Sequence, residues 1–293
     1  MSREVHLVDG TYELFRYFFA PAREWTSADE SVAAVAGVVT SVFSMLDDGA
    51  THLGVATDHV IESFRNDMYA GYKTSAGVAP ELLAQFGLLE DALSALGVKV
   101  WAMVDLEADD ALASGAAVAA ESSDVSRVLI CTPDKDLGQC VVGDRVVQVD
   151  RRRRLVIDEA GVREKFGVGP CSIADYLGLV GDSADGFPGL PGFGAKTSAA
   201  LLARWLHIED IPVSAVDWSV KVRGAEKLAR VLAEQRDDAL LFKDIATLRV
   251  DRSLLDSVDD LRWTGPAPEF AALCELLGTP GLLARAEKLA GER

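Results

Sequence analysis

The sequence predicts an α/β protein with a mostly parallel sheet flanked by helices, followed by a helical region. Short apolar segments alternate with segments of helical spacing over the first half of the chain, which is typical of a parallel sheet. From about Cys171 onward the strand signal fades and only helical patterns remain. We therefore expect two domains, a core at 1–170 and a helical region at 171–293.

The strands are expected where short apolar runs end at a turn or an acidic residue. These runs are 4–8, 52–56, 98–104 and 127–132, and two further segments, 145–149 and 155–157, are expected to form a hairpin around four arginines. The helices are expected where apolar residues recur at every third or fourth position. In chain order they are 29–46, 62–72, 80–96, 107–120, 173–180, 195–206, 225–244 and 267–277.

Composition excludes several classes of protein. The 293 residues are 49% hydrophobic and 26% charged, which is ordinary for a folded chain and unlike a disordered one. No apolar run reaches the roughly 18 residues of a membrane span, and the N-terminus lacks the features of a signal peptide. The four cysteines form no C-x-x-C pair, so we expect reduced thiols in a cytoplasmic protein, without disulfides or zinc.

The net charge of −17 at first argues against a nucleic-acid partner, but the charge is unevenly distributed. Residues 1–110 contain 6 Lys and Arg against 18 Asp and Glu, whereas residues 127–230 contain 15 against 14. An acidic protein can still bind DNA if its basic residues share one face and metal ions neutralise part of the acid. Charge alone therefore does not exclude DNA.

Acidic side chains follow the ends of the expected strands. The carboxyl ends of parallel strands meet at one edge of a sheet, where ligands bind. Nine carboxylates fall at such ends or in a later turn: Asp9, Asp58, Glu107, Asp109, Asp110, Asp134, Asp136, Asp182 and Asp185. Crowded carboxylates repel one another unless cations lie among them, and an all-oxygen ligand set favours Mg²⁺ or Mn²⁺ over Zn²⁺. A site for more than one such ion is the arrangement used for phosphodiester hydrolysis.

Each group of acids also has an ordinary structural interpretation. An aspartate after a strand is commonly a turn former or a helix cap. The acids from Glu107 to Asp110 could simply favour a helix N-terminus electrostatically. It is the joint pattern, with acids at the ends of successive strands, that favours a metal site over caps alone.

The segment Gly189–Thr197 is rich in glycine and ends in Lys196-Thr197. It is a poor match to a P-loop, because one residue too many separates the last glycine from Lys196 and because the segment follows a helix. We expect two helices joined by a tight turn at Gly192-Phe193-Gly194, with amides at the second helix's N-terminus placed to receive a phosphate. An ordinary helix–turn–helix corner is the alternative.

Four motifs stand in order along the chain. They are Asp58-x6-Arg65-x3-Tyr69-x2-Tyr72-Lys73, Glu107-Ala-Asp109-Asp110, Thr132-Pro-Asp134-Lys135-Asp136-Leu137, and Gly181-Asp182-x2-Asp185 running on to Gly192-Phe-Gly194-Ala-Lys196-Thr197. Together they resemble the bacterial 5′→3′ exonuclease and flap endonuclease family, which includes the N-terminal domain of bacterial DNA polymerase I. The resemblance covers residues 4–206 clearly and the rest weakly.

The resemblance implies a PIN-like 5′ nuclease core with a helical arch at about 61–96, and a helix-hairpin-helix extension. It places the nine carboxylates around two or more metal ions. The first set is Asp9, Asp58, Glu107 and Asp109, the second is Asp134, Asp136, Asp182 and Asp185, and Asp110 lies nearby. The resemblance also implies that Arg65 and Lys73 hold and polarise the scissile phosphate, and that Lys135 contacts the same strand.

The resemblance assigns DNA binding to Arg16 and to the turn and helix start formed by Gly192, Phe193, Gly194, Lys196 and Thr197, with K⁺ held at the turn. Three places depart from the family's usual pattern, the first being Thr57, which precedes Asp58 where an aromatic residue is common. Thr74 to Gly77 contains no basic residue after the Tyr-Lys pair, and Gly186 stands where an asparagine is usual.

The function implied is a Mg²⁺-dependent 5′ nuclease in DNA replication and repair, located in the cytoplasm at the nucleoid. Its partner would be DNA with a free 5′ end or a 5′ flap. Two alternatives stay open: a catalytically weak protein of the same fold that binds branched DNA, and a PIN-like ribonuclease.

Overall fold

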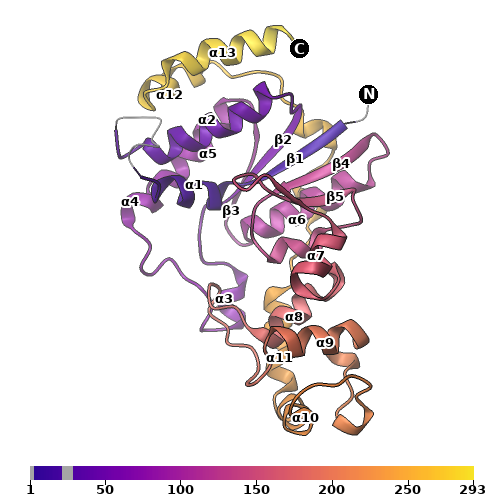
Figure 1. Ribbon diagram of the computed structural model, residues 1–293. Helices are drawn as coiled ribbons and strands as arrows, with labels where there is room; N and C mark the ends of the chain where they lie inside the picture. The colour runs from indigo at the N-terminus through magenta and orange to yellow at the C-terminus, as the bar shows by residue number, and fades with distance from the viewer. Residues whose placement is uncertain (1–2, 22–28) are drawn as a thin grey trace. The chain divides into compact units, whose positions relative to one another are not determined.

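The computed structural model describes residues 3–21 and 29–293 (Figure 1). The chain forms two compact units, each built from segments that are not contiguous in sequence. The sheet unit comprises Met1–Ile61, Ser75–Thr132 and Val250–Arg293, and the helical unit comprises Glu62–Thr74 and Pro133–Arg249.

The sheet unit contains four parallel strands. They are β1 (Arg3–Asp9), β2 (His52–Asp58), β3 (Lys99–Met103) and β4 (Val125–Cys131), in the spatial order β3-β2-β1-β4. In register, Val8 of β1 lies beside Val55 of β2 on one side and beside Cys131 of β4 on the other. The predicted parallel sheet is confirmed, and its strands end at one common edge.

Helices surround these strands. They are α1 (Gly10–Phe18), α2 (Ala33–Asp47), α4 (Pro80–Leu83), α5 (Gln85–Ala95), α6 (Ala108–Glu121), α12 (Phe270–Leu276) and α13 (Pro280–Gly291). Some are packed on the sheet, whereas α4, α12 and α13 are packed on other helices. In Figure 1, α2 and α5 lie on one side of the sheet and α6 on the other, where α6 contacts all four strands. Alanine and glycine on α6 permit this close approach: a Cβ on Gly115 would lie 3.1 Å from Trp101.

The last 44 residues return to the sheet unit, although the sequence placed them with the helical region. The short 3₁₀ helices η6 (Arg252–Leu254) and η7 (Val258–Leu261) lead this return. The indole of Trp101 donates to the carbonyl of Leu254 at 2.7 Å, and the indole of Trp263 donates to that of Leu96 at 2.7 Å. These two buried indoles need hydrogen-bond partners, and they anchor the returning segment.

The helical unit begins with α3 (Phe64–Met68) and continues through the elements after residue 133. In chain order these are η2 (Asp136–Cys140), β5 (Val146–Asp150), β6 (Leu155–Ile157), α7 (Glu159–Phe166), η3 (Pro170–Ser172), α8 (Ile173–Val180), α9 (Ala195–Trp205), η4 (Ile208–Asp210), η5 (Ala215–Asp217), α10 (Ala225–Glu234) and α11 (Arg236–Ala246). β5 and β6 form the predicted antiparallel hairpin.

Two expected helices of this unit differ from the structure. The helix expected at 62–72 is only five residues long, because Tyr69 adopts an extended conformation (φ −146°) after Met68. The helix expected at 225–244 is divided into α10 and α11 at Gln235, whose φ of −122° interrupts the helical path. Aromatic packing holds the core of the unit, where the rings of Phe187 and Phe242 stack at 5.6 Å.

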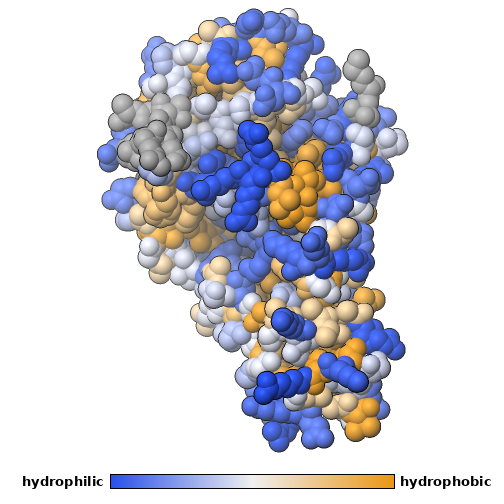
Figure 2. All heavy atoms as spheres, viewed as in Figure 1, coloured by the Kyte–Doolittle hydropathy of each residue, from blue (hydrophilic) through white to orange (hydrophobic). Residues whose placement is uncertain are grey.

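The surface visible in Figure 2 is mostly hydrophilic, with small separate hydrophobic patches. In the ranges 3–21 and 29–293, no helix combines the length and hydrophobicity needed to cross a membrane.

Candidate metal centre and basic residues

Asp9 joins the ends of two neighbouring strands in the sheet unit. It is the last residue of β1 and caps α1, with one carboxylate oxygen accepting the backbone N–H of Tyr12 at 2.8 Å. Its other oxygen accepts the hydroxyl of Thr132, directly after β4, at 2.8 Å. The helix-cap interpretation is therefore correct for Asp9. The cap also fixes a buried carboxylate at the carboxyl edge of the sheet.

Asp58 and the start of α6 meet at the same edge. Asp58 ends β2, and its carboxylate accepts the backbone N–H of Ala108, the first residue of α6, at 2.8 Å. Asp110 accepts the backbone N–H of Glu107 at 3.0 Å and is fully buried. The positive end of the helix dipole stabilises negative charge at these positions. Asp109 lies between them in the first turn of α6. The sheet unit thus gathers five of the nine carboxylates at its carboxyl edge.

The helical unit gathers three carboxylates at a second place. One oxygen from each of Asp136, Asp182 and Asp185 lies within 4.8 Å of the others. A tight loop holds the last two: the backbones of Asp182 and Phe187 exchange hydrogen bonds at 2.8 and 3.0 Å. Asp182 also accepts the N–H of Ala184 at 3.0 Å. The loop therefore presents two acids toward η2, which carries the third.

Asp136 provides the most direct sign of a cation site. Its side chain is buried, and its Oδ1 atom has no hydrogen-bond partner in the described structure. Burial raises the pKa of Asp136 well above its usual value, and repulsion from Asp134 and Asp185 raises it further. A buried carboxylate oxygen without a donor, beside two further acids, suits a hard divalent cation with oxygen ligands. The acidic cluster therefore suggests bound divalent metal ions.

Lys135 lies among these acids. Its ammonium pairs with the carboxylate of Asp182 and lies 4.0 Å from that of Asp136. Burial lowers the pKa of Lys135, but attraction to Asp136 and Asp182 outweighs this effect and the pKa is raised overall. Lys135 is therefore a fixed positive charge that partly neutralises the cluster.

Lys73 is held against the same loop. Its ammonium lies 3.2 Å from the carboxylate of Asp185, and its backbone N–H donates to the carbonyl of Asp185 at 3.0 Å. The amide of Asn66 donates to the carbonyl of Lys73 at 2.9 Å. The structure thus places Lys73 beside Asp185, and its contact with a phosphate stays a prediction.

Arg65 is placed differently from Lys73. It is 2% exposed, and its Nε donates to the carbonyl of Ile245 at 2.8 Å and its Nη2 to that of Thr247 at 3.2 Å. These carbonyls lie at the C-terminal end of α11, where the helix dipole favours a positive charge. Two of the three guanidinium nitrogens are thus committed to backbone, and contact of Arg65 with a phosphate stays a prediction.

The glycine-rich turn connects α8 to α9. Gly192 has a φ of +88°, which favours glycine, and Gly194 caps α9. Gly192, Gly194 and Lys196 are exposed, whereas the ring of Phe193 is 3% exposed and belongs to the core of the helical unit. The turn can therefore offer backbone groups and Lys196 to a ligand, while the Phe193 side chain holds the turn in place.

Comparison with known protein families shows which family models match this chain. Residues 4–167 match the family model of the 5′-3′ exonuclease N-terminal resolvase-like domain, and residues 168–269 match that of the 5′-3′ exonuclease C-terminal SAM fold. The chain belongs to the 5′-3′ exonuclease family. The two matches meet at residues 167 and 168, whereas the compact units of the structure divide at other positions, so the domain boundary near residue 170 stays a prediction.

Members of this family with related sequences are bacterial DNA polymerases. DNA polymerase I of Bacillus caldotenax is 31% identical over 100% of this chain and 33% of its own length. DNA polymerase I of Pseudomonas aeruginosa is 34% identical over 87% of this chain and 28% of its own length. The chain thus spans about a third of the length of these relatives.

Solved structures share the fold of this family member. The T5 D15 protein co-crystallized with metal ions has a TM-score of 0.67 at 16% identity, and covers 98% of this chain and 100% of its own. The catalytic core of Rad2 in complex with DNA substrate has a TM-score of 0.63 at 12% identity, over 99% of this chain and 91% of its own.

Arg16, expected among the DNA-binding residues, is held within α1 of this 5′-3′ exonuclease family member. Its guanidinium pairs with Glu13 one turn earlier and lies 4.0 Å from the centre of the Tyr17 ring. Burial lowers the pKa of Arg16, but its hydrogen bond to Glu13 outweighs this effect and the pKa is raised overall. DNA contact by Arg16 stays a prediction.

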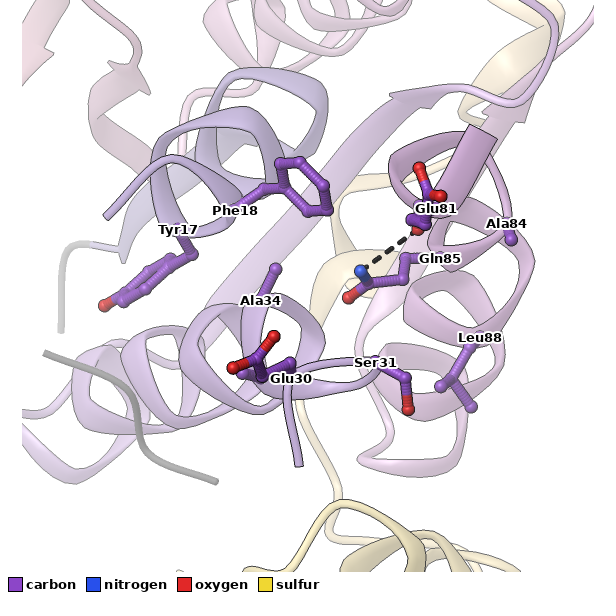
Figure 3. A pocket seen from close by; sticks show the side chains of 10 residues that line it. Tyr17, Phe18, Glu30, Ser31, Ala34, Glu81, Ala84, Gln85 and Leu88 are labelled. Carbon is purple, nitrogen blue, oxygen red and sulfur yellow. Dashed lines mark hydrogen bonds between the residues drawn. The ribbon is translucent and has the colours of Figure 1, made fainter. Parts of the chain in front are cut away.

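A separate pocket of about 590 Å³ lies at the far end of α1. Figure 3 shows its mostly apolar walls, formed by Tyr17, Phe18, Ala33, Ala34, Ala84 and Leu88. The amide of Gln85, which also lines it, donates to the carbonyl of Glu81 at 3.2 Å. Asp9 caps the other end of this helix, about 13 Å away at roughly 1.5 Å per residue. This pocket is therefore no part of the acidic edge.

Three supporting side chains were missed by the sequence analysis. The hydroxyls of Thr11 and Thr132 bond to the backbone N–H of Asp58 and to the carboxylate of Asp9, each at 2.8 Å. The amide of Gln148 donates to the backbone carbonyl of Asp134. Threonines one or two residues after a strand end were a usable signal for the first two. Nothing in the local sequence around Gln148 indicates its contact.

Proposed function

We propose that this chain is a structure-specific 5′ nuclease that hydrolyses DNA phosphodiesters at 5′ ends and 5′ flaps during replication and repair. The observation that carries the proposal is the cluster of Asp136, Asp182 and Asp185, with the unpartnered buried oxygen of Asp136. Family membership supports nuclease activity. The DNA in the Rad2 structure and the metal ions in the T5 structure support the substrate and the cofactor class.

The nine carboxylates are the proposed ligands of two or more Mg²⁺ or Mn²⁺ ions. In the sheet unit these are Asp9, Asp58, Glu107 and Asp109, with Asp110 supporting them, and in the helical unit Asp134, Asp136, Asp182 and Asp185. When bound, divalent ions lower the pKa of water and stabilise charge on the phosphate in the transition state. The product strand would then carry a 5′-phosphate.

The basic residues have separate proposed roles. Lys73 would orient the scissile phosphate, because its ammonium already lies 3.2 Å from the carboxylate of Asp185. Lys135 would give up its contact with Asp182 and bind a phosphate of the DNA strand that contains the scissile phosphate. Arg65 would act with Lys73, either by contacting the phosphate or by holding the segment that carries Lys73 in place. Arg16 is a further proposed contact to DNA.

The turn before α9 is the proposed grip on the DNA duplex. Gly192 and Gly194 would contribute backbone groups, Lys196 and Thr197 side chains, and Phe193 the packing that holds the turn. Carbonyls of this turn would bind K⁺. The amides at the start of a helix suit an anionic phosphate.

A 5′-labelled flap DNA, incubated with and without Mg²⁺ at low salt, tests the proposal. We expect the wild-type chain to release a short labelled fragment only when Mg²⁺ is present. The Asp182→Asn variant should release none. Asp150→Asn is the matched control, because Asp150 is a buried acid of the same unit that accepts the N–H of Arg153 at 2.9 Å, outside the cluster. Flap binding without cleavage would instead support the branched-DNA-binding alternative, and cleavage of single-stranded RNA alone would support the ribonuclease.

A further inference from the structure

Four consecutive residues at the end of α11 bind side chains from two distant segments. Arg65 donates to the carbonyls of Ile245 and Thr247, as described above. The amide of Gln139 donates to the carbonyl of Ala246, between them, at 2.8 Å. The same amide accepts the N–H of Leu248 at 3.3 Å. The last carbonyls of a helix lack partners within it, and here side chains supply them.

Gln139 connects this helix end to the acidic cluster. It lies on η2, three residues after Asp136. Side chains three residues apart in a 3₁₀ helix are eclipsed and lie on the same side. A rotation of η2 that released Gln139 would therefore move Asp136 as well.

Asp136 is held through its backbone in η2, where its N–H donates to the carboxylate of Asp134 at 3.0 Å, whereas its Oδ1 atom has no hydrogen-bond partner in the described residues. A 3₁₀ helix of five residues has few hydrogen bonds of its own and poor bonding geometry. The two hydrogen bonds of Gln139, to residues more than 100 positions away, therefore restrain the element that presents Asp136 to Asp182 and Asp185.

We propose that Gln139 is a positioning residue for the metal centre: by bonding to the end of α11, it holds η2 so that Asp136 faces Asp182 and Asp185 and the cluster binds a divalent ion tightly. This inference rests on the proposed function. In this role Gln139 acts through η2 and not by contact with substrate or metal. Residues that hydrogen-bond directly to metal ligands contribute about 10- to 100-fold to metal affinity, and we expect the indirect effect of Gln139 at the lower end of that range.

The test compares Mn²⁺ binding by the full chain and its variants, measured by the electron paramagnetic resonance signal of unbound Mn²⁺. Gln139→Met has similar length and no hydrogen-bonding amide, and we expect it to bind Mn²⁺ about 10-fold more weakly, the lower end of the range for direct partners of metal ligands. Gln139→Asn keeps an amide that is one methylene too short to reach both partners, and we expect a smaller loss. Because Gln139→Asn keeps a polar amide, it disturbs folding less. It still tests the positioning role if Gln139→Met does not fold.

Arg236→Met is the matched control. Arg236 begins α11 at its opposite end and donates to the carbonyls of Glu209 and Ile211. Its loss should lower the melting temperature of the metal-free protein and leave Mn²⁺ affinity unchanged. Equal weakening in Arg236→Met and Gln139→Met would overturn the inference, because it would reflect general loosening of α11.

The wild-type chain separates this inference from the proposed function. If it binds Mn²⁺ and folded Gln139→Met binds within twofold of it, only the positioning role is overturned. If the wild-type chain binds no Mn²⁺, both the proposed function and the positioning role are overturned.

Discussion

Gly186 lies directly against the backbone of Gly71: a Cβ atom at Gly186 would be 2.1 Å from the Gly71 carbonyl oxygen. Gly186 also has a φ of +88°. The two residues bring the segment of Lys73 onto the loop of Asp182 and Asp185. The close backbone contact and the positive φ therefore both favour glycine at position 186.

We predict that Gly186→Ala destabilises the protein and separates these segments. The conformational strain alone costs about 1–3 kcal/mol, and the contact with backbone adds to it. Gly77→Ala is the control, because Gly77 has a φ of +89° and its Cβ would meet nothing within 4 Å. Urea unfolding of both variants isolates the effect of the contact, and equal free energies of unfolding would contradict the prediction.

We predict that Asp136→Asn stabilises the metal-free protein increasingly as pH rises. The folded-state pKa of Asp136 is raised, chiefly by burial and also by neighbouring acids. A raised carboxyl pKa favours folding at low pH, and this contribution is lost as pH rises through the folded pKa. Asparagine stays neutral throughout. The measurement is the free energy of unfolding from pH 5 to pH 8.

The effect of Mg²⁺ on the free energy of unfolding is a second test of the same prediction. The ion should stabilise the wild-type chain at pH 8 and have little effect on Asp136→Asn, because binding to the folded state alone raises its stability. Stability curves of the two proteins that run parallel from pH 5 to pH 8 would contradict the assignment of Asp136.

The sheet and most of its helices were predictable, because apolar periodicity reports burial. The helices α1 and α13 were missed, although the apolar residues of α1 are spaced as on an amphipathic helix, because its sequence Gly-Thr-Tyr-Glu-Leu-Phe-Arg-Tyr-Phe is short and rich in aromatic residues. The start of α1 is fixed by Asp9, which the sequence analysis weighed as a cap but did not join to a helix. The return of residues 250–293 to the sheet unit depends on Trp101 and Trp263, whose partners lie far away in sequence.

The acids of the candidate site were predictable for a geometric reason, since parallel strands bring their carboxyl ends together. What each acid bonds to was not. The two bonds of Gln139 join residues more than 100 positions apart, and the lack of a donor at the buried oxygen of Asp136 is a property of the folded chain alone. The burial of Arg65 arises in the same way, and a sequence motif cannot distinguish such an anchored arginine from one that faces DNA.

We predict that Phe193→Ala acts mainly on stability. The ring is 3% exposed and packs in the core of the helical unit, so its removal should cost about 3–5 kcal/mol. Phe19→Ala is the control, because the Phe19 side chain is 71% exposed and should change stability by no more than about 0.5 kcal/mol. Thermal unfolding compares them, and a stable Phe193→Ala variant with impaired DNA binding would show a direct contact instead.

We predict that Lys196→Ala weakens DNA binding without destabilising the fold. Lys196 is exposed in the first turn of α9, beside amides suited to a phosphate, so its loss removes about one phosphate contact. The slope of log affinity against log salt should fall in magnitude by about 1, with no change in sequence preference. Lys227→Ala removes an exposed lysine from α10 of the same unit and should leave the slope unchanged. Fluorescence anisotropy of a labelled duplex at several salt concentrations measures both slopes. If the two variants gave the same slope as the wild-type chain, the turn before α9 would not be the place where this protein holds the phosphate backbone.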